Sequence, residues 1–425
     1  MQFLTPSENP SYQSSTFLKR WIPEWIHQKE RIEAWLADYS KKWTPPIYAS
    51  VDIRHSKFKS AVIDTNLFSA GFNNLNEDAR IKAIHAFTRA LARRNLQNKR
   101  ILLIPERHTR NTFYLESLNV IADLLKATGA DLKIGFWEHE SEIELNEEFK
   151  QLNWQPIARE KSMLKIGEWS PDLILLNNDL SSSVPEILQN LSTPLISPPL
   201  EAGWHNRRKS THFTFYNNIT RDFAHAFNID AWHLNTDTDI VENVDFSDEH
   251  SLQNLQESIT QLLEKINNRY IQHGILEKPY VVIKPDAGTY GMGIMMVHDA
   301  SELTQLNRKQ KNKMSVIKDG VHVNRVLLQE GISSLETYNN ITAESVMYMV
   351  DDEVVGRFYR VHPSKDAESN LNAPGMLCEP VILDMNNPEI YLHSIVARFA
   401  LIAASQEIAQ YTQHAAASTI EQHLF

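Results

Sequence analysis

The segment with the clearest capacity for chemistry begins at Lys284, where the apolar run YVVIK (280–284) leads into a glycine-rich loop. Three glycines follow closely: Gly288, Gly291 and Gly293. Glycine lets backbone N–H groups approach phosphate oxygens and tolerates positive φ, and a lysine ammonium adds charge for the same oxygens. The lysine precedes the glycines and is followed by proline, so neither the P-loop nor the Rossmann pattern fits. The segment favours a phosphate loop over its alternative, a glycine-rich hairpin.

Polar residues that suit a nucleotide follow downstream in a fixed order. An apolar strand expected at 326–329 ends in Gln329 and Glu330, where strand backbone can contact an adenine edge and a carboxylate can accept from ribose hydroxyls. Two arginines, Arg357 and Arg360, then follow an expected hairpin. With Lys284 they could hold the charge that develops on a transferred phosphoryl group, so these three are the candidate catalytic residues.

Candidate metal ligands come from the same stretch of chain. Two carboxylates and two amides supply hard oxygen atoms: Glu344, Glu368, Asn370 and Asn372. Mg²⁺ bound to a nucleotide usually takes one or two carboxylates, with phosphates and water completing its octahedron. Any one of these acids alone is better interpreted as a surface residue. Their order after the glycine loop is what indicates an ATP and Mg²⁺ site.

Polar clusters upstream could hold further substrates. One follows an expected strand at 48–53, a second follows an expected strand at 100–104, and a third covers 204–209. Open α/β sheets bind ligands at the carboxyl ends of their strands, and arginine forks suit carboxylates. The alternative is that these side chains are solvated or cap helices. The candidate substrate residues are Arg54, Lys57, Asp64, Asn66, Glu106, Arg107 and Arg110.

The elements that must position these residues alternate in type. Helices are expected at 18–42, 79–95 and 109–128, and strands at 48–53, 100–104, 132–136, 172–176 and 194–196. Strands that alternate with helices predict a parallel sheet. The chain is then mainly helical over 205–275. Short β segments follow at 326–329, 345–350 and 354–360, with a hairpin turn at Asp351-Asp352, and a helix at 389–411 closes the chain.

Length and composition limit the class of protein. A chain of 425 residues is too long for one ordinary core, and we divide it at 1–46, 47–204, 205–279 and 280–425. The net charge of −11 argues against nonspecific nucleic-acid binding. A single cysteine, Cys378, builds no disulfide framework and favours a reducing compartment; we interpret it as partly buried rather than nucleophilic. Without a signal peptide or an apolar span, we expect a cytoplasmic protein without a membrane partner.

The order of motifs from Lys284 to Gly375 resembles an ATP-grasp nucleotide domain, and 343–375 resembles the metal and phosphate end of bacterial glutathione synthetase. From about residue 18 onward the chain resembles proteobacterial glutamate–cysteine ligases. The carrying segments are SVDIRHSKFK (50–59), VIDTNLF (62–68), GFNN (71–74) and IPERHTRN (104–111). The resemblance implies an ATP-grasp-like α/β fold with an N-terminal parallel-sheet region and a C-terminal α+β nucleotide region.

The resemblance also implies a reaction, in which ATP, L-glutamate and L-cysteine give γ-glutamylcysteine through an acyl phosphate, as the first step of glutathione biosynthesis. ATP-grasp enzymes often carry a second phosphate lysine upstream of the glycine loop, and Lys265 and Lys278 are the counterparts considered. The rival hypotheses are an ATP-grasp ligase for other substrates, such as a glutathione synthetase, and a non-catalytic ATP-binding regulator. The expected partners are small molecules, and a homo-oligomer is compatible with the sequence.

Overall fold

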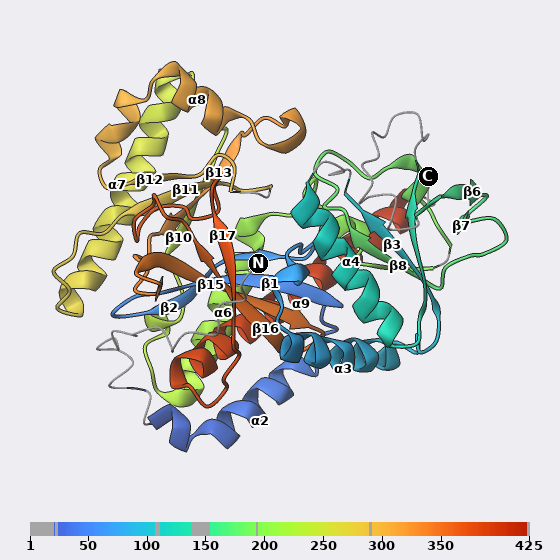
Figure 1. The fold of residues 1–425 in the computed structure, drawn as a ribbon. Coiled ribbons are helices and arrows are strands. Elements are labelled where there is room, and N and C mark those ends of the chain that lie inside the picture. Colours follow the sequence, from blue (N-terminus) through green and yellow to red (C-terminus); the bar gives the residue numbers. More distant parts are fainter. Residues whose placement is uncertain are drawn as a thin grey trace.

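Three larger sheets and one two-stranded hairpin form the described part of the protein (Figure 1). The computed structural model describes residues 21, 24–106, 111–137, 154–192, 194–288 and 291–422, without the side chains of 319 and 414–422. A parallel sheet lies at the right of Figure 1, a large antiparallel sheet at the centre, and a smaller antiparallel sheet at the upper left. The expected α/β class is confirmed, with a parallel-sheet region beside antiparallel sheets that pack against helices.

The parallel sheet is the α/β layer that the alternating pattern predicted. Its order is β5 (Gln155–Pro156), β4 (Asp131–Phe136), β3 (Arg100–Pro105), β8 (Leu173–Asn177) and β9 (Leu195–Ser197). Helix α4 (Thr112–Ala127) packs against β4, and α3 (Glu77–Arg93) packs against α4 and the central antiparallel sheet. Both begin at an asparagine N-cap, since Asn76 accepts from the Ala79 N–H and Asn111 from the Tyr114 N–H. A small hairpin, β6 (Ala158–Glu160) and β7 (Met163–Lys165), stands apart.

The central sheet is antiparallel throughout, and it combines two strands from the first part of the chain with four strands from the last part. Its order is β17 (Leu377–Val381), β16 (Glu353–Val361), β15 (Ile341–Val350), β1 (Tyr48–His55) and β2 (Ser60–Asn66), with β14 (Thr337–Tyr338) paired to β15. The hairpin at Asp351-Asp352 is present, with Asp351 at φ 56°. Our boundary at residue 47 grouped β1 and β2 with the parallel sheet, whereas both strands pair in the central sheet. The four-region division stays a prediction.

The smaller antiparallel sheet carries the glycine loop. Its order is β10 (Thr238–Glu242), β13 (Arg325–Glu330), β11 (Val281–Pro285) and β12 (Met295–Val297). Helix α7 (Glu249–Gln272) packs on it, and α8 (Arg308–Ser315) follows β12 along the chain. Buried residues of α7, β11 and β13 form a separate core. Strand β10 interrupts the stretch that we predicted to be mainly helical.

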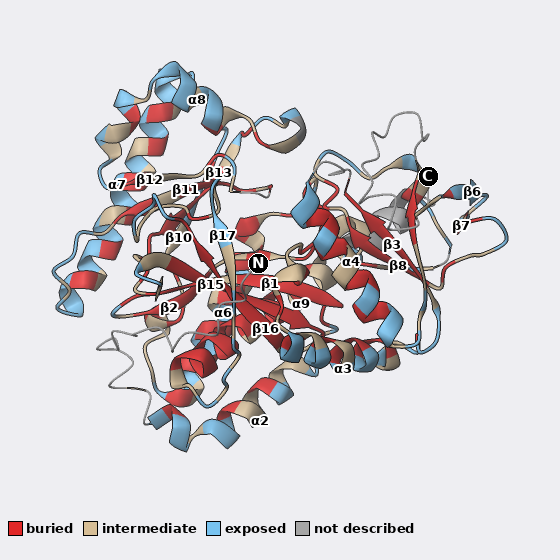
Figure 2. Ribbon diagram, in the orientation of Figure 1, coloured by how far each residue is buried: buried red, intermediate tan, exposed pale blue. Residues whose placement is uncertain are grey.

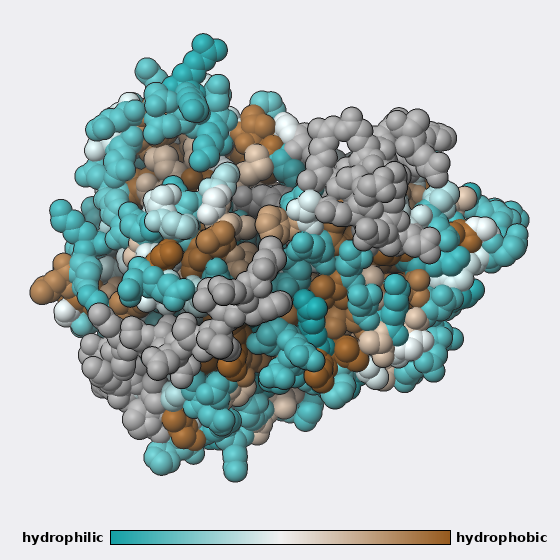
Figure 3. Space-filling model, viewed as in Figure 1, coloured by the Kyte–Doolittle hydropathy of each residue, from teal (hydrophilic) through white to brown (hydrophobic). Residues whose placement is uncertain are grey.

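Three helices cover the face of the central sheet that lies away from the small sheet: α2 (Lys29–Ser40), α6 (Lys209–Phe227) and α9 (Pro388–Gln422). Figure 2 shows buried residues concentrated in the sheets and on the inner faces of the helices. The guanidinium of Arg207 and the carboxylate of Glu407, both almost inaccessible, tie the start of α6 to α9 through an Nε–Oε1 contact of 2.9 Å. Figure 3 shows a mainly hydrophilic face with small separate hydrophobic patches. Among the described residues, no helix combines the length and apolarity needed to cross a bilayer.

Candidate active site

A pocket opens between the small sheet and the central sheet, with about 730 Å³ of empty space when the open solvent at its mouth is included. The small sheet contributes Lys284 and the loop after it, and the central sheet contributes residues of β1, β2, β15 and β16. Twelve of the sequence-predicted residues line it: Arg54, Asp64, Lys284, Gly288, Gly291, Gln329, Glu330, Glu344, Arg360, Glu368, Asn370 and Asn372.

Lys284 crosses from β11 to the edge of the central sheet. Its ammonium Nζ donates to the backbone oxygen of Ile63 on β2 at 2.8 Å, and the residue is 6% exposed. Burial lowers the pKa of Lys284 to about 8, against the opposing attraction of Asp64. The ammonium is therefore poorly solvated, and an anionic ligand in the pocket would stabilise its charged form.

The glycines of the loop have the backbone conformations that the sequence predicted. Gly288, Gly291 and Gly293 have φ of +107°, +63° and +65°. A Cβ on Gly291 would lie 2.6 Å from the backbone oxygen of Asn372, so this position has no room for a side chain. Gly293 faces Pro285 and is not among the pocket's lining residues. Gly288 and Gly291 are therefore the glycines placed to approach a ligand.

The second lysine of the pocket is Lys209, at the first position of α6. Its Nζ lies 2.7 Å from Asp64 Oδ1 and 4.6 Å from the centre of the Trp204 ring. Lys209 and nearby Lys284 lower the pKa of Asp64 to about 2, despite its burial. Of the lysines considered from sequence, Lys265 pairs with Asp237 away from the pocket and Lys278 is exposed. Lys209 is thus the residue that sequence reasoning missed in this role.

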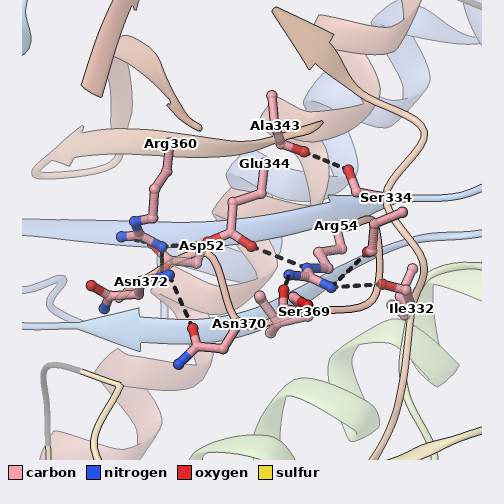
Figure 4. A network of polar contacts seen from close by, with 12 residues as sticks. Asp52, Arg54, Ile332, Ser334, Ala343, Glu344, Arg360, Ser369, Asn370 and Asn372 are labelled. Atoms are coloured by element: carbon pink, nitrogen blue, oxygen red, sulfur yellow. Dashed lines mark hydrogen bonds and ion pairs between the residues drawn. The ribbon is translucent and has the colours of Figure 1, made fainter. Parts of the chain in front are cut away.

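Two arginines converge on Glu344, as Figure 4 shows. Arg54 Nε donates to Glu344 Oε2 at 3.0 Å, and Arg360 NH1 donates to Glu344 Oε1 at 2.6 Å. Arg360 also reaches Asp52 Oδ2 at 2.7 Å. Although burial acts against ionisation, the two guanidinium groups hold the pKa of Glu344 below its usual range. The floor of the pocket is a buried array of alternating charges.

Arg54 also organises the backbone around the pocket. Its NH1 donates to the carbonyl oxygens of Ile332 and Ala367, both at 3.1 Å, and its NH2 donates to that of Ser369 at 2.5 Å. We expected Arg54 to bind a substrate carboxylate. In the structure most of its donors serve Glu344 and these carbonyl groups, so its position fits the support of the 367–369 segment.

The predicted metal ligands gather at this segment. Glu368 accepts from the Ser333 hydroxyl at 3.1 Å and lies 3.1 Å from His298 Nε2, and Asn370 donates to the Gly291 carbonyl at 3.2 Å. Glu344 already contacts two guanidinium groups. Within the described residues, no three acidic, histidine or cysteine side chains form a ready metal site. The donors fit a cation that arrives with phosphate oxygens rather than a preformed all-protein site.

Two residues that we predicted to bind the nucleotide instead form side-chain hydrogen bonds and ion pairs within the protein. Glu330 accepts from Lys59 Nζ at 2.7 Å and from Trp232 Nε1 at 3.1 Å. Gln329 donates to the Thr236 hydroxyl at 3.0 Å. We expected the Glu330 carboxylate to bind ribose, but at 1% exposure it is held by these donors. Both residues line the pocket, but their backbone is also paired, since β13 lies between β10 and β11 and the Glu330 N–H donates to the Asp237 carbonyl, so the predicted adenine and ribose contacts are not supported by their positions.

Arg357 does not lie with Arg360. The two residues are opposite Met347 and Glu344 respectively in β15, and their odd spacing sends the side chains to opposite faces of the sheet. Arg357 stacks on Tyr359 and donates to the Ile382 carbonyl at 3.2 Å, outside the set of pocket-lining residues. Its predicted contact with phosphate is therefore not supported by its position.

The five other predicted substrate residues lie outside the pocket lining or outside the described chain. Lys57 forms an exposed pair with Glu277, and Asn66 accepts from the Phe68 N–H within a turn. Glu106 contacts Lys318 at the edge of the parallel sheet. Arg107 and Arg110 are outside the described residues. Cys378 is partly buried, and burial raises its pKa, as a structural thiol requires.

Comparisons with known proteins show the family of the chain. The model of the glutamate-cysteine ligase family (GshA) matches residues 24–408. A crystal structure from Methylobacillus flagellatus KT, described as a candidate gamma-glutamylcysteine synthetase, is 38% identical, with a TM-score of 0.85 and coverage of 95% of this chain and 99% of that chain. A comparison with curated sequences gives no match.

Two D-alanine ligases show a much weaker likeness. D-alanyl-alanine synthetase A of Vibrio cholerae has a TM-score of 0.36 at 9% identity, with 71% of this chain and 81% of that chain covered. D-alanine-D-alanine ligase of Helicobacter pylori has a TM-score of 0.28 at 11% identity, with 72% and 98% covered. Neither carries the assignment, which rests on the family model and the Methylobacillus structure. The chain belongs to the glutamate–cysteine ligase family and is an ATP-dependent ligase.

Proposed function

We propose that the protein joins the γ-carboxylate of L-glutamate to the amine of L-cysteine at the expense of ATP, giving γ-glutamylcysteine, ADP and phosphate. The observation that carries this proposal is one pocket in which Lys209, Lys284 and the glycine loop face the Asp52, Glu344 and Arg360 array, in a chain of the glutamate–cysteine ligase family. This activity would be the first step of glutathione biosynthesis, and we place it in the cytoplasm.

The chemistry requires activation of the carboxylate. An amine does not displace oxide from a carboxylate, because oxide is a poor leaving group and the carboxylate charge repels the nucleophile. Attack of the γ-carboxylate on the γ-phosphate gives an acyl phosphate and ADP, and the amine then displaces phosphate. The protein's contribution is to fix the reactants and to stabilise charge on the transferred phosphoryl group.

The residues of the pocket divide this work. Lys209 and Lys284 face the pocket near the glycine loop, where their charges suit nucleotide phosphates. Arg360 lines the same space; Arg54 lines it too, but most of its donors serve Glu344 and backbone carbonyl groups. Gly288 and Gly291 give backbone N–H groups close access to phosphate oxygens. Arg357 has no part in the proposed chemistry.

Mg²⁺ would be held by Glu368 and Asn370, with Glu344 and Asn372 beside them, on the side of the pocket nearest the glycine loop. When bound it would neutralise phosphate charge. Arg54 and Arg360 would keep Glu344 ionised, and the Gly291 carbonyl would orient Asn370 through their hydrogen bond.

Product analysis tests the proposal. The purified chain is incubated with ATP, Mg²⁺ and amino acids offered singly and in pairs, and products are identified by mass. We expect γ-glutamylcysteine and ADP only when glutamate and cysteine are both present. A different condensed pair would leave the ATP-dependent ligase and overturn the substrates. Formation of glutathione from γ-glutamylcysteine and glycine would favour the rival synthetase.

A further inference from the structure

Lys318 links the glycine-loop lobe to the parallel sheet. It begins a short 3-10 turn (Lys318–Gly320) and inserts its ammonium between two carboxylates, with Nζ 2.9 Å from Glu106 Oε1 and 2.8 Å from Asp179 Oδ1. The side chains of Lys318, Glu106 and Asp179 are 12%, 10% and 5% exposed. Because all three charged side chains are largely enclosed, water screens their ion pairs much less than it screens an ion pair on the surface.

The two acids are placed by the carboxyl edge of the parallel sheet. Glu106 directly follows β3, and Asp179 lies two residues after β8. The Asp179 N–H donates to Glu106 Oε1 at 2.8 Å, which fixes one acid relative to the other. Burial and the neighbouring Asp179 raise the pKa of Glu106 to about 7, while Lys318 acts in the opposite direction. Lys318 therefore compensates charge on both acids.

On its other side Lys318 adjoins the residue that supports the glycine loop. The side chain of Ile317 lies against both glycines: a Cβ added at Gly288 would be 2.8 Å from Ile317 Cδ1, and one added at Gly293 would be 3.6 Å from Ile317 Cγ2. The Ile317 N–H also donates to the Val321 carbonyl. A continuous path of packed groups thus runs from the loop through Ile317 and Lys318 to Glu106 and Asp179.

We propose that Lys318 is a positioning residue for ATP: its two ion pairs hold Ile317 against Gly288 and Gly293, so that the loop keeps its phosphate-binding conformation. Neither acid nor Lys318 is among the pocket-lining residues, so the effect passes through Ile317. This inference rests on the proposed use of the pocket for ATP. It adds a coupling between the parallel sheet and the nucleotide loop that the family assignment does not supply.

Substitution of Lys318 tests the coupling. We expect Lys318→Met to weaken ATP binding, measured by titration calorimetry with ATP and Mg²⁺, by about tenfold, because a charge-assisted contact is lost. Lys318→Arg keeps the charge and should remain within about threefold of wild type. Lys313→Met, on the exposed face of α8, is the matched control and should bind ATP normally. In steady-state assays the KM for ATP should rise more than kcat falls.

Exchange of the charges separates coupling from a loss of folding. If Lys318→Met is unfolded by circular dichroism, the pair Lys318→Glu with Glu106→Lys, which keeps an ion pair across the same junction, should fold and regain at least part of the ATP affinity lost in Lys318→Glu. Normal ATP affinity in folded Lys318→Met, or no recovery in the folded exchange variant, would overturn the inference. A wild-type chain that binds no ATP would instead refute the proposed function.

Discussion

Lys284 could be recognised from sequence because its chemistry is local. A strand, a lysine and three glycines are contiguous, and glycine's conformational freedom explains their use. Lys209 could not be recognised, because it lies in another segment, at the start of α6, and reaches the pocket only through the packing of that helix against β2. Arg54 was recognised as important, but sequence gives no information about the carbonyl groups that its guanidinium contacts.

The pKa of Lys284 predicts how ATP binding depends on pH. Burial lowers the pKa to about 8, and the ammonium form attracts phosphate, so affinity should fall as pH rises through this value. We expect ATP to bind about tenfold more weakly at pH 9 than at pH 7. Lys284→Arg stays charged and should show a much flatter profile in parallel titrations. Equal slopes for the two proteins would exclude Lys284 as the titrating group.

Replacement of Lys209 should affect the nucleotide more than the fold. Lys209→Ala removes one of two ammonium groups from the pocket and leaves Asp64 without its 2.7 Å partner. We expect ATP affinity to fall by about ten- to a hundredfold, from the loss of a charge-assisted contact and the uncompensated carboxylate. Lys265→Ala, whose side chain is about half exposed outside the pocket, is the control. Comparable ATP affinities in the two variants would remove Lys209 from the site.

At the scale of elements, most strands and helices were predictable and their pairing was not. The apolar runs at 100–104, 132–136 and 172–176 correspond to β3, β4 and β8. β3 and β8 are buried on both faces of the parallel sheet, which explains their continuous apolar sequences, and β4 is buried in its second half. By contrast, the spacing of Arg357 and Arg360 already implies that their side chains lie on opposite faces of β16, so our prediction that both contact phosphate conflicted with their own sequence. That spacing decides which arginine can reach the pocket.

Two glycines with similar positive φ allow the effect of backbone strain to be separated from the effect of a steric clash in the glycine loop. Gly291→Ala would place a Cβ 2.6 Å from the Asn372 carbonyl oxygen at φ +63°, whereas Gly274→Ala meets nothing within 4 Å at φ +66°. Both substitutions carry a similar strain, roughly 1–2 kcal/mol, but only the first also displaces the 370–372 segment. We expect a large rise in the KM for ATP in Gly291→Ala alone. The contrary result, similar KM values with similar losses of melting temperature, would place the loop outside the site.

A buried acid on the other face of the central sheet predicts a pH-dependent stability. Burial raises the pKa of Glu336 to about 7, although it accepts from the Ser345 hydroxyl at 2.6 Å and N–H at 3.1 Å. Its folded pKa exceeds the unfolded value, so the protonated acid stabilises below about pH 4.5 and this contribution is lost as pH rises through 7.

Glu336→Gln imitates the protonated acid at all pH values. Relative to wild type, its free energy of unfolding should therefore improve by about 2–3 kcal/mol between pH 5 and pH 8, whatever the constant offset. The difference between the proteins reports Glu336 together with the groups it faces: Glu389, whose pKa burial and Glu336 raise to about 7, and His393, whose Nδ1 lies 3.9 Å from Glu336 Oε1. Urea unfolding at both pH values makes the measurement. A constant difference would show that Glu336 is ionised throughout.

At the scale of the molecule, the pocket exists because distant segments meet. β1 pairs with β15, so Tyr48 lies opposite Val350, and the central sheet unites regions that composition and motif order separate. Sequence from one chain gives each strand's pattern but not its long-range partner, since many apolar strands are interchangeable at that level. The same limit hid the contact of Lys59 with Glu330, which joins the two sheets that enclose the pocket.

Loss of that contact should destabilise the whole protein. Lys59 lies in the turn between β1 and β2 and Glu330 ends β13; both side chains are fully buried, with Nζ 2.7 Å from Oε2. Lys59 also donates to the Asn235 carbonyl at 3.0 Å. Removal of one member of a buried ion pair leaves the other charge without compensation, so Lys59→Met should cost about 3–5 kcal/mol in the free energy of unfolding.

The double variant and a neighbouring lysine make this prediction specific. Lys59→Met with Glu330→Gln removes both charges and should recover a large part of the loss, because no unpaired ion remains buried. Lys57→Met, two residues away in an exposed pair with Glu277, should cost less than about 1 kcal/mol. ATP titration of the folded variants should follow the same order, since the contact sets the spacing of the two sheets. A Lys59→Met protein as stable as Lys57→Met would mean that the apolar cores alone hold the sheets together.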